Sequence, residues 1–245
     1  RYVRGTLPPN RQEFMIKGAM PDPAWFCAWQ FSRVLQQQGI EVAKPATTCR
    51  ISGQQDRPTT EIFTHLSKPL AQIAKTTNYK SVNLYAEAML RILGHQLKGE
   101  GTTEAGAEAM REYWEQKGVD MAGSFIEDGS GLSRFNALNA RQMTSILALA
   151  EAADTPPENR LKALLPVVGK SGTLKYLCRN SPAAGRVYAK SGSISRVRAY
   201  TGFASTLSGK EVVFTILLNN FGKSYIEITR DVERVMNMIV RLNPA

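Results

Sequence analysis

Three stretches with an alternating apolar and polar pattern follow one another closely in the last third of the sequence. They cover about residues 186–191, 196–206 and 211–219, and Ser208-Gly209 supplies turn residues between the second and the third. Strands with such short connections pair antiparallel with their sequence neighbours, because a parallel connection needs a crossover of about a dozen residues. The sequence therefore predicts an antiparallel three-stranded meander, whose faces the rest of the chain has to cover.

Helical periodicity dominates the chain before and after these strands. The predicted helices cover about residues 67–77, 84–98, 103–116, 139–150 and 224–242. Asn139 and Gln142 have the spacing of a capping box at the start of one of them. Gly94 lies inside another helix, where glycine is mildly unfavourable. Helices flanking an antiparallel sheet give an α/β (α+β) fold.

The amino-terminal part has its own pattern. Residues 1–20 predict a small hairpin with turn residues at Pro8-Pro9-Asn10, and Asp22-Pro23 predicts the capped start of a helix that runs to Gly39. Residues 40–57, rich in Thr, Gly, Gln and Pro, form the candidate seam between this part and the helices that follow.

The chain carries a formal net charge of +10, which suits an anionic partner. Nucleic acid is not the expected partner, because the 31 Lys and Arg residues are scattered and form no basic run or aromatic-glycine RNA-binding pattern. An acidic cell-wall peptide or an anionic envelope surface accounts for the charge equally well. The longest apolar runs are too short to span a membrane.

Cysteine and histidine residues are few and far apart. Cys27, Cys49 and Cys178 form no C-x-x-C motif, and an odd number leaves at least one thiol unpaired. A Cys27–Cys49 bridge stays open as an alternative, although buried thiols are favoured. His65 and His95 have no companion ligands at metal spacing, so neither a metal site nor a cofactor is expected.

Two short motifs carry residue types that acyl transfer requires. Lys190-Ser191-Gly192 places a cation, a hydroxyl and a bare backbone along one strand edge, and Ser81-Val82-Asn83 places a hydroxyl and an amide ahead of a helix. The second motif alone is also an ordinary helix start. A second Lys-Ser-Gly at 170–172 competes with the first, but no strand of comparable length follows it, so we favour Lys190.

With their surroundings, these motifs resemble two of the three signatures of the penicillin-binding, active-site-serine peptidases. The stretches Asn83–Glu87, Asp128–Arg134 and Gly172–Leu174 make the chain similar to the D-alanyl-D-alanine carboxypeptidase/endopeptidase family of the penicillin-binding-protein-4 type, from about Gly5 to the end. The resemblance implies a penicillin-binding-protein/serine β-lactamase-like catalytic domain, with an antiparallel sheet flanked by helices. Residues 1–50 would be the carboxyl-terminal part of a small inserted domain, and residues 51–245 an incomplete transpeptidase-like domain.

The resemblance also implies catalytic roles. Ser81 relays protons, Asn83 positions the lysine and the substrate, and Lys190 supplies a positive field that favours the serine anion. The hydroxyl of Ser191 binds the terminal carboxylate of the substrate, and Gly192 lets the substrate backbone lie close to the strand.

Further residues are implied at the rim of the site. The Ser193 N–H serves as one oxyanion donor. Arg134 binds the side-chain carboxylate of the cross-linking residue, which a guanidinium pairs in bidentate fashion, and Ser195 lines the same pocket. The implied partners are peptidoglycan stem peptides and β-lactams, in the periplasm or cell envelope, with peripheral envelope association left open.

The first family signature, S-x-x-K, does not occur in the sequence. No serine has lysine three residues later, and Thr77 with Lys80 has the spacing but the wrong hydroxyl residue. We expect the nucleophile to lie before Arg1 in a longer parent and the isolated chain to be unable to acylate. Without the nucleophile segment, the meander would keep an exposed edge and an uncovered apolar face. We therefore expect a homo-oligomer, pairing with a partner chain or strand exchange to compensate.

Two other functions remain as alternatives. The same cleft could belong to a non-catalytic protein that binds a peptidoglycan peptide. A β-lactamase shares the motifs, but it fits the inserted region and the Ser-Gly-Leu-Ser-Arg loop poorly.

Overall fold

The computed structural model describes residues 6, 9, 13, 15, 18, 20–53, 60–61 and 63–244. The chain divides into two compact units, Arg1–His65 and Leu66–Ala245. Most of the hairpin predicted for residues 1–20 lies outside the described residues. No helix within the described ranges is both long enough and apolar enough to cross a bilayer.

The first unit contains the helix α1 (Pro23–Gln37) and the single turn α2 (Cys49–Ser52). The carboxylate of Asp22 caps α1 by accepting a hydrogen bond from the N–H of Trp25 at 3.0 Å, as the Asp-Pro sequence predicts. The indole of Trp25 in turn donates to the carbonyl of Ala46 at 3.1 Å. This bond fixes the segment after α1 against the helix.

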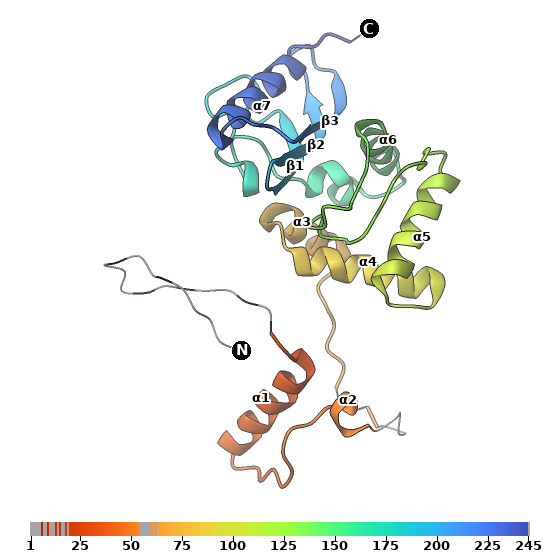
Figure 1. Ribbon diagram of the computed structural model, residues 1–245, viewed down its shortest axis with the longest axis vertical. Helices are drawn as coiled ribbons and strands as arrows, with labels where there is room; N and C mark the ends of the chain where they lie inside the picture. The colour runs from red at the N-terminus through yellow and green to blue at the C-terminus, as the bar shows by residue number, and fades with distance from the viewer. Residues whose placement is uncertain are drawn as a thin grey trace. The chain divides into compact units, whose positions relative to one another are not determined.

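The second unit contains the predicted meander (Figure 1). Its strands β1 (Val187–Ile194), β2 (Val197–Ser205) and β3 (Glu211–Asn219) are antiparallel and ordered β1-β2-β3. Only Ser195 and Arg196 connect the first two strands, and Arg196 adopts the left-handed conformation (φ 59°) that such a tight turn requires. This turn lets β1 continue to Ile194, three residues beyond its predicted end.

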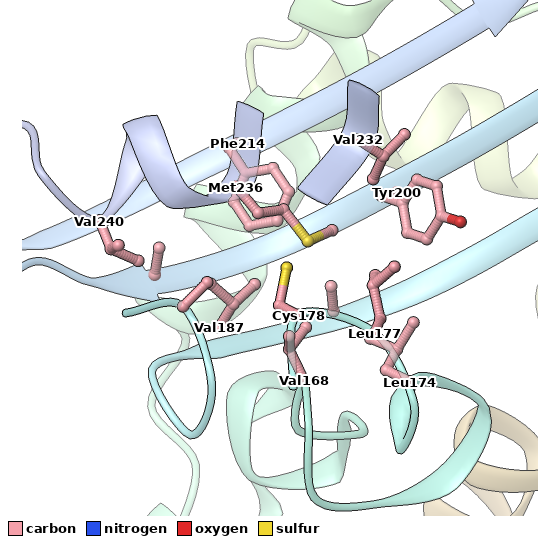
Figure 2. Packing of buried hydrophobic residues seen from close by; sticks show 13 residues of the cluster. Val168, Leu174, Leu177, Cys178, Val187, Tyr200, Phe214, Val232, Met236 and Val240 are labelled. Atoms are coloured by element: carbon pink, nitrogen blue, oxygen red, sulfur yellow. The ribbon is translucent and has the colours of Figure 1, made fainter. Parts of the chain in front are cut away.

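Two helices cover the two faces of the sheet. The helix α7 (Tyr225–Ile239) packs on one face, where it encloses the larger hydrophobic core (Figure 2). This core includes Val168, Leu174, Leu177, Cys178, Val187, Tyr200, Phe214, Val232, Met236 and Val240. The helix α6 (Ala140–Glu151) packs on the other face through Leu147, which contacts Phe203. The expectation of an uncovered apolar face is therefore wrong, because α6 and α7 each pack on one face of the sheet.

Three further helices of the second unit precede α6: α3 (Leu70–Lys80), α4 (Asn83–Lys98) and α5 (Thr103–Gln116). A Cβ on Gly94 would lie 2.6 Å from the N of Gly106, and a Cβ on Gly106 would lie 2.2 Å from the carbonyl oxygen of Leu90. The backbones of α4 and α5 therefore touch at this crossing. Glycine inside a helix is destabilising, but Gly94 allows α4 to pack closely against α5.

Short 3-10 helices connect α6 to the sheet. They are η1 (Pro157–Asn159), η2 (Leu161–Leu164) and η3 (Gly172–Leu174). The side-chain amide of Asn78 in α3 donates to the carbonyl of Leu164 at 3.2 Å. A Cβ on Gly172 would lie 3.0 Å from the carbonyl oxygen of Tyr79. Both contacts hold the end of α3 against the segment that leads into β1.

Candidate active site

The break between α3 and α4 presents Ser81. This residue adopts a left-handed conformation (φ 52°, ψ 56°) and ends α3, where its N–H donates to the carbonyl of Thr77. Such a conformation costs a non-glycine residue about 1 kcal/mol or more, so the surrounding packing has to hold it. Asn83 follows as the first residue of α4. The Ser-x-Asn motif is thus a sharp turn between two helices.

Lys190 of β1 meets this turn. Its Nζ donates a hydrogen bond to the Oγ of Ser81 at 3.1 Å and another to the carbonyl of Ser191. Burial lowers the pKa of the Lys190 ammonium below its ordinary value, because the charged form loses hydration. A half-buried cation, whose pKa is lowered by its burial, therefore touches a serine hydroxyl.

The outer edge of β1 is covered over only part of its length. The N–H of Val168 donates to the carbonyl of Val187 at 2.9 Å, and the N–H of Ala189 donates to the carbonyl of Pro166 at 3.0 Å. By the alternation of an antiparallel ladder, Ser191 and Ser193 direct their N–H groups to this same edge. In the part of the chain that the structure describes, no backbone group pairs with these two N–H groups.

The second Lys-Ser-Gly motif forms a turn beside this edge. Its Ser171 hydroxyl accepts a hydrogen bond from the N–H of Val167 at 2.9 Å, and the Lys170 side chain lies over Gly185 rather than over Ser81. Thr173, which follows in η3, places its hydroxyl 3.0 Å from the hydroxyl of Ser191. The competing motif therefore contributes a threonine to the site but not its lysine.

A carboxylate organises the loop of residues 128–134. Asp128 accepts hydrogen bonds from the N–H groups of Gly131, Leu132 at 3.2 Å and Ser133 at 2.6 Å, and from the Asn136 amide at 3.1 Å. Burial alone would raise the pKa of Asp128, but these donors stabilise its carboxylate and hold the pKa below its usual value of 3.8. The loop thus has a defined internal structure.

Glu87 attaches this loop to α4. Its carboxylate accepts hydrogen bonds from the N–H of Gly129 at 3.0 Å and the N–H of Ser130 at 3.1 Å. A Cβ on Gly129 would lie 2.7 Å from the carbonyl oxygen of Ala86, so only glycine allows this approach. The loop is therefore docked one turn beyond Asn83.

The other expected site residues take part in no such contacts. The structure gives no hydrogen bond between the side chain of Asn83 and either Ser81 or Lys190, all three of which lie in described regions. Arg134 is exposed at the end of the docked loop, and Ser195 is exposed in the turn after β1. The described residues contain no group of three or more His, Cys, Asp or Glu side chains that could hold a metal ion.

Three residues of the site were missing from the sequence-based assignment: Glu87, Asp128 and Thr173. All three belong to stretches that carried the family resemblance, but no role was assigned to them. Asp128 had a local signal, because Asp before Gly-Ser-Gly is typical of a side-chain-capped turn. The contacts of Glu87 and Thr173 join segments that are distant in the sequence, so local patterns do not reveal them.

Comparison with known proteins finds relatives along nearly the whole chain. Residues 2–241 match the model of the D-Ala-D-Ala carboxypeptidase 3 (S13) family. The D-alanyl-D-alanine carboxypeptidase of Actinomadura sp. (strain R39) is 31% identical over 223 residues, which are 89% of this chain and 40% of that protein. The D-alanyl-D-alanine carboxypeptidase DacB of Haemophilus influenzae is 27% identical over 231 residues, which are 93% of this chain and 47% of that protein.

The fold is also that of a solved structure. Penicillin-binding protein 4 (dacB) from Haemophilus influenzae, complexed with a β-lactam, superposes with a TM-score of 0.78 at 24% identity, covering 92% of this chain and 53% of that one. The chain thus spans about half the length of the relatives it matches. Because the family model covers nearly all 245 residues, the chain belongs to the D-Ala-D-Ala carboxypeptidase S13 family.

Proposed function

We propose that the protein containing this chain is a serine D-Ala-D-Ala carboxypeptidase/endopeptidase that cleaves peptidoglycan stem peptides through an acyl-enzyme and binds β-lactams. The observation that carries this proposal is the 3.1 Å contact between Lys190 Nζ and Ser81 Oγ, beside the part of the β1 edge that no described backbone group pairs. The names of the relatives support the substrate class, since both are D-alanyl-D-alanine carboxypeptidases.

The chemistry requires two coupled proton movements. A nucleophilic hydroxyl loses its proton as its oxygen bonds to the carbonyl carbon of the scissile peptide, and the leaving nitrogen gains a proton as the C–N bond breaks. Ser81, hydrogen-bonded to Lys190, is placed to relay a proton to that nitrogen. The lowered pKa of Lys190 makes the proton easier to release. Water then hydrolyses the acyl-enzyme and regenerates the hydroxyl.

The substrate strand would lie along the open edge of β1. The Ser191 hydroxyl would bind its terminal carboxylate, Gly192 would admit its backbone, and the Ser193 N–H would donate to the oxyanion. Asn83, at the start of α4, would position the lysine and the substrate. Arg134, held on the docked loop, would bind a carboxylate on the substrate side chain, and Ser195 would line the same pocket.

The nucleophile itself is proposed to lie outside these 245 residues, because no Ser-x-x-Lys occurs among them. The separate compact unit Arg1–His65 supports assigning the first 50 residues to an inserted domain. The family membership supports a location in the periplasm or cell envelope. Within the described residues the outer edge of β3 is unpaired, so a segment of the longer protein or a second copy would add there.

Labelling with a fluorescent penicillin tests the proposal. The full-length protein should be labelled, and the isolated 245-residue chain should not. In the full-length protein, the variants S81A and K190M should each slow acylation by about 10²–10⁴-fold, as expected for a lost proton relay. The matched control is K170M, which removes the lysine of the other Lys-Ser-Gly motif and should leave labelling close to that of the wild type.

Three outcomes would contradict parts of the proposal. Labelling of the isolated chain would show that it contains its own nucleophile. Normal labelling of K190M would exclude the proposed relay. If the complete reading frame lacked Ser-x-x-Lys, the protein would instead be a non-catalytic binder of peptidoglycan peptides.

A further inference from the structure

A second hydroxyl stands beside Ser191 at the open edge of β1. The Oγ1 of Thr173 and the Oγ of Ser191 are 3.0 Å apart, within hydrogen-bond distance. We propose that Thr173 is a positioning residue that donates its proton to Ser191, so that Ser191 keeps its own proton for the carboxylate of the substrate. This inference rests on the proposed function, which assigns the carboxylate to Ser191.

The argument follows from how many hydrogen bonds a hydroxyl can make. Each hydroxyl has one proton to donate and two lone pairs to accept with, so the pair can be arranged in two ways. If Ser191 donated to Thr173, it would turn only lone pairs toward an arriving anion. If Thr173 donates instead, the Ser191 proton stays free. A carboxylate selects this second arrangement, because a charge-assisted bond is about twice as strong as a neutral one.

The residues on both sides of Thr173 are fixed. Gly172 has a left-handed conformation (φ 56°), and a Cβ there would lie 2.9 Å from the Cβ of Pro166. On the other side, Leu174 is only 2% exposed and belongs to the core beneath α7. The short helix η3 therefore has little freedom to carry Thr173 away from the strand.

The segment that leads into η3 is attached to β1 itself. Val167 forms an antiparallel bridge with Tyr188, and the Val167 N–H also donates to the Ser171 hydroxyl at 2.9 Å. The two ends of the Thr173–Ser191 contact thus belong to paired segments, and their separation follows from that pairing. The Lys190 ammonium, bonded to the carbonyl of Ser191, adds a positive charge that favours an anion at this place.

Variants of the full-length protein test the inference. The substrates are a peptide ending in D-Ala-D-Ala with a free carboxylate and the same peptide with a carboxyl-terminal amide. Because one hydrogen bond to the anion is weakened, T173V should lower kcat/KM for the carboxylate peptide by about five- to tenfold, mainly through KM, with little change for the amide. T173S keeps the hydroxyl and should behave as the wild type.

The matched control is T229V, which removes a threonine hydroxyl that donates within α7 at 2.8 Å. It should leave both substrates unaffected. Two outcomes would overturn the inference, because each would indicate a packing role. One is an equal loss of kcat/KM for both peptides in T173V. The other is a T173S variant that loses as much kcat/KM as T173V. Valine has nearly the shape of threonine, and a thermal melt of T173V checks that the fold is retained.

Equilibrium binding separates this inference from the proposed function. If the wild-type full-length protein is not labelled by penicillin, the proposed catalytic function fails. Calorimetric binding of the carboxylate peptide still tests Thr173 in that case, and the T173V variant should weaken it by about five- to tenfold relative to T173S. Unchanged binding in T173V would refute the inference whatever the labelling shows.

Discussion

Removing the Glu87 carboxylate should release the loop that carries Arg134. The carboxylate accepts two hydrogen bonds, at 3.0 Å from the N–H of Gly129 and at 3.1 Å from the N–H of Ser130. Gly129 fits closely against the backbone of α4, but this close packing adds no hydrogen bond between the loop and the helix. The variant E87A would therefore remove the main polar attachment between the loop and the helix.

The size of the effect follows from these two bonds. A hydrogen bond to a charged group contributes about 1.5–3 kcal/mol, and the lower end applies because Glu87 is only half-buried and water replaces part of the loss. Together the two bonds should give about 2–3 kcal/mol of docking free energy, which is about 30- to 150-fold in the opening equilibrium. E87Q keeps a neutral oxygen acceptor and should lose about 1 kcal/mol.

Hydrogen exchange measured by mass spectrometry gives a direct assay, because the affected N–H groups belong to the loop itself. In E87A, a peptide covering Gly129 and Ser130 should exchange about 30- to 150-fold faster, and E87Q should be intermediate. The control E115A changes an exposed glutamate near the end of α5 and should have no effect on this peptide. Exchange in E87A within twofold of the wild type would refute the reasoning.

Three further predictions concern other parts of the second unit. G106A would bring a Cβ within 2.2 Å of the carbonyl oxygen of Leu90, so it should lower stability by about 3 kcal/mol in urea unfolding, and an unchanged midpoint would contradict this. Burial, and secondarily the charge of Glu233, raises the pKa of Cys178 to about 11. At pH 8 iodoacetamide should therefore modify only the other two cysteines, which are exposed, until the protein is unfolded. Because the Asp128 pKa is lowered on folding, its contribution to stability is present above pH 3.8 and lost as the pH falls through the folded value. In the wild type, the protection of this loop from hydrogen exchange should therefore decrease as the pH falls through that value. In D128N it should not depend on pH in this way.

Much of the fold of the second unit could be predicted from the sequence, because the relevant signals are local. The meander follows from the spacing of its strands, and the structure confirms it. Capping boxes at Asn139 and Ser224 start α6 and α7, and each helix begins one residue after its predicted start. The start of α3 was predicted at Ser67, too early, since Pro69 is its N-cap and the helix begins at Leu70.

The predictions that were wrong or incomplete concern contacts between distant segments. The favoured prediction of buried thiols is wrong for Cys27 and Cys49, which are exposed, and holds only for Cys178. The Cys27–Cys49 bridge left open as an alternative does not form, since all three thiols are free in the structure. Gly94 appeared only as a weak point of its helix, because the partner that it touches, Gly106, lies on another helix. Likewise, Lys190 could be paired with Ser81 only through the family resemblance. Nothing local to either residue indicates a contact across more than one hundred positions.

The geometry of the candidate site depends on how α3 packs against the segment before β1. Ser81 ends α3, whereas Lys190 and Ser191 lie on β1, so their distance depends on how the segment before β1 packs against α3. One of the contacts between them is the close approach of Gly172 in η3 to the carbonyl of Tyr79, two residues before Ser81. A side chain at 172 would push α3 outward and lengthen the Ser81–Lys190 hydrogen bond. Gly172 therefore allows the packing that positions Ser81 near Lys190, although Lys170 of the same motif makes no contact with Ser81.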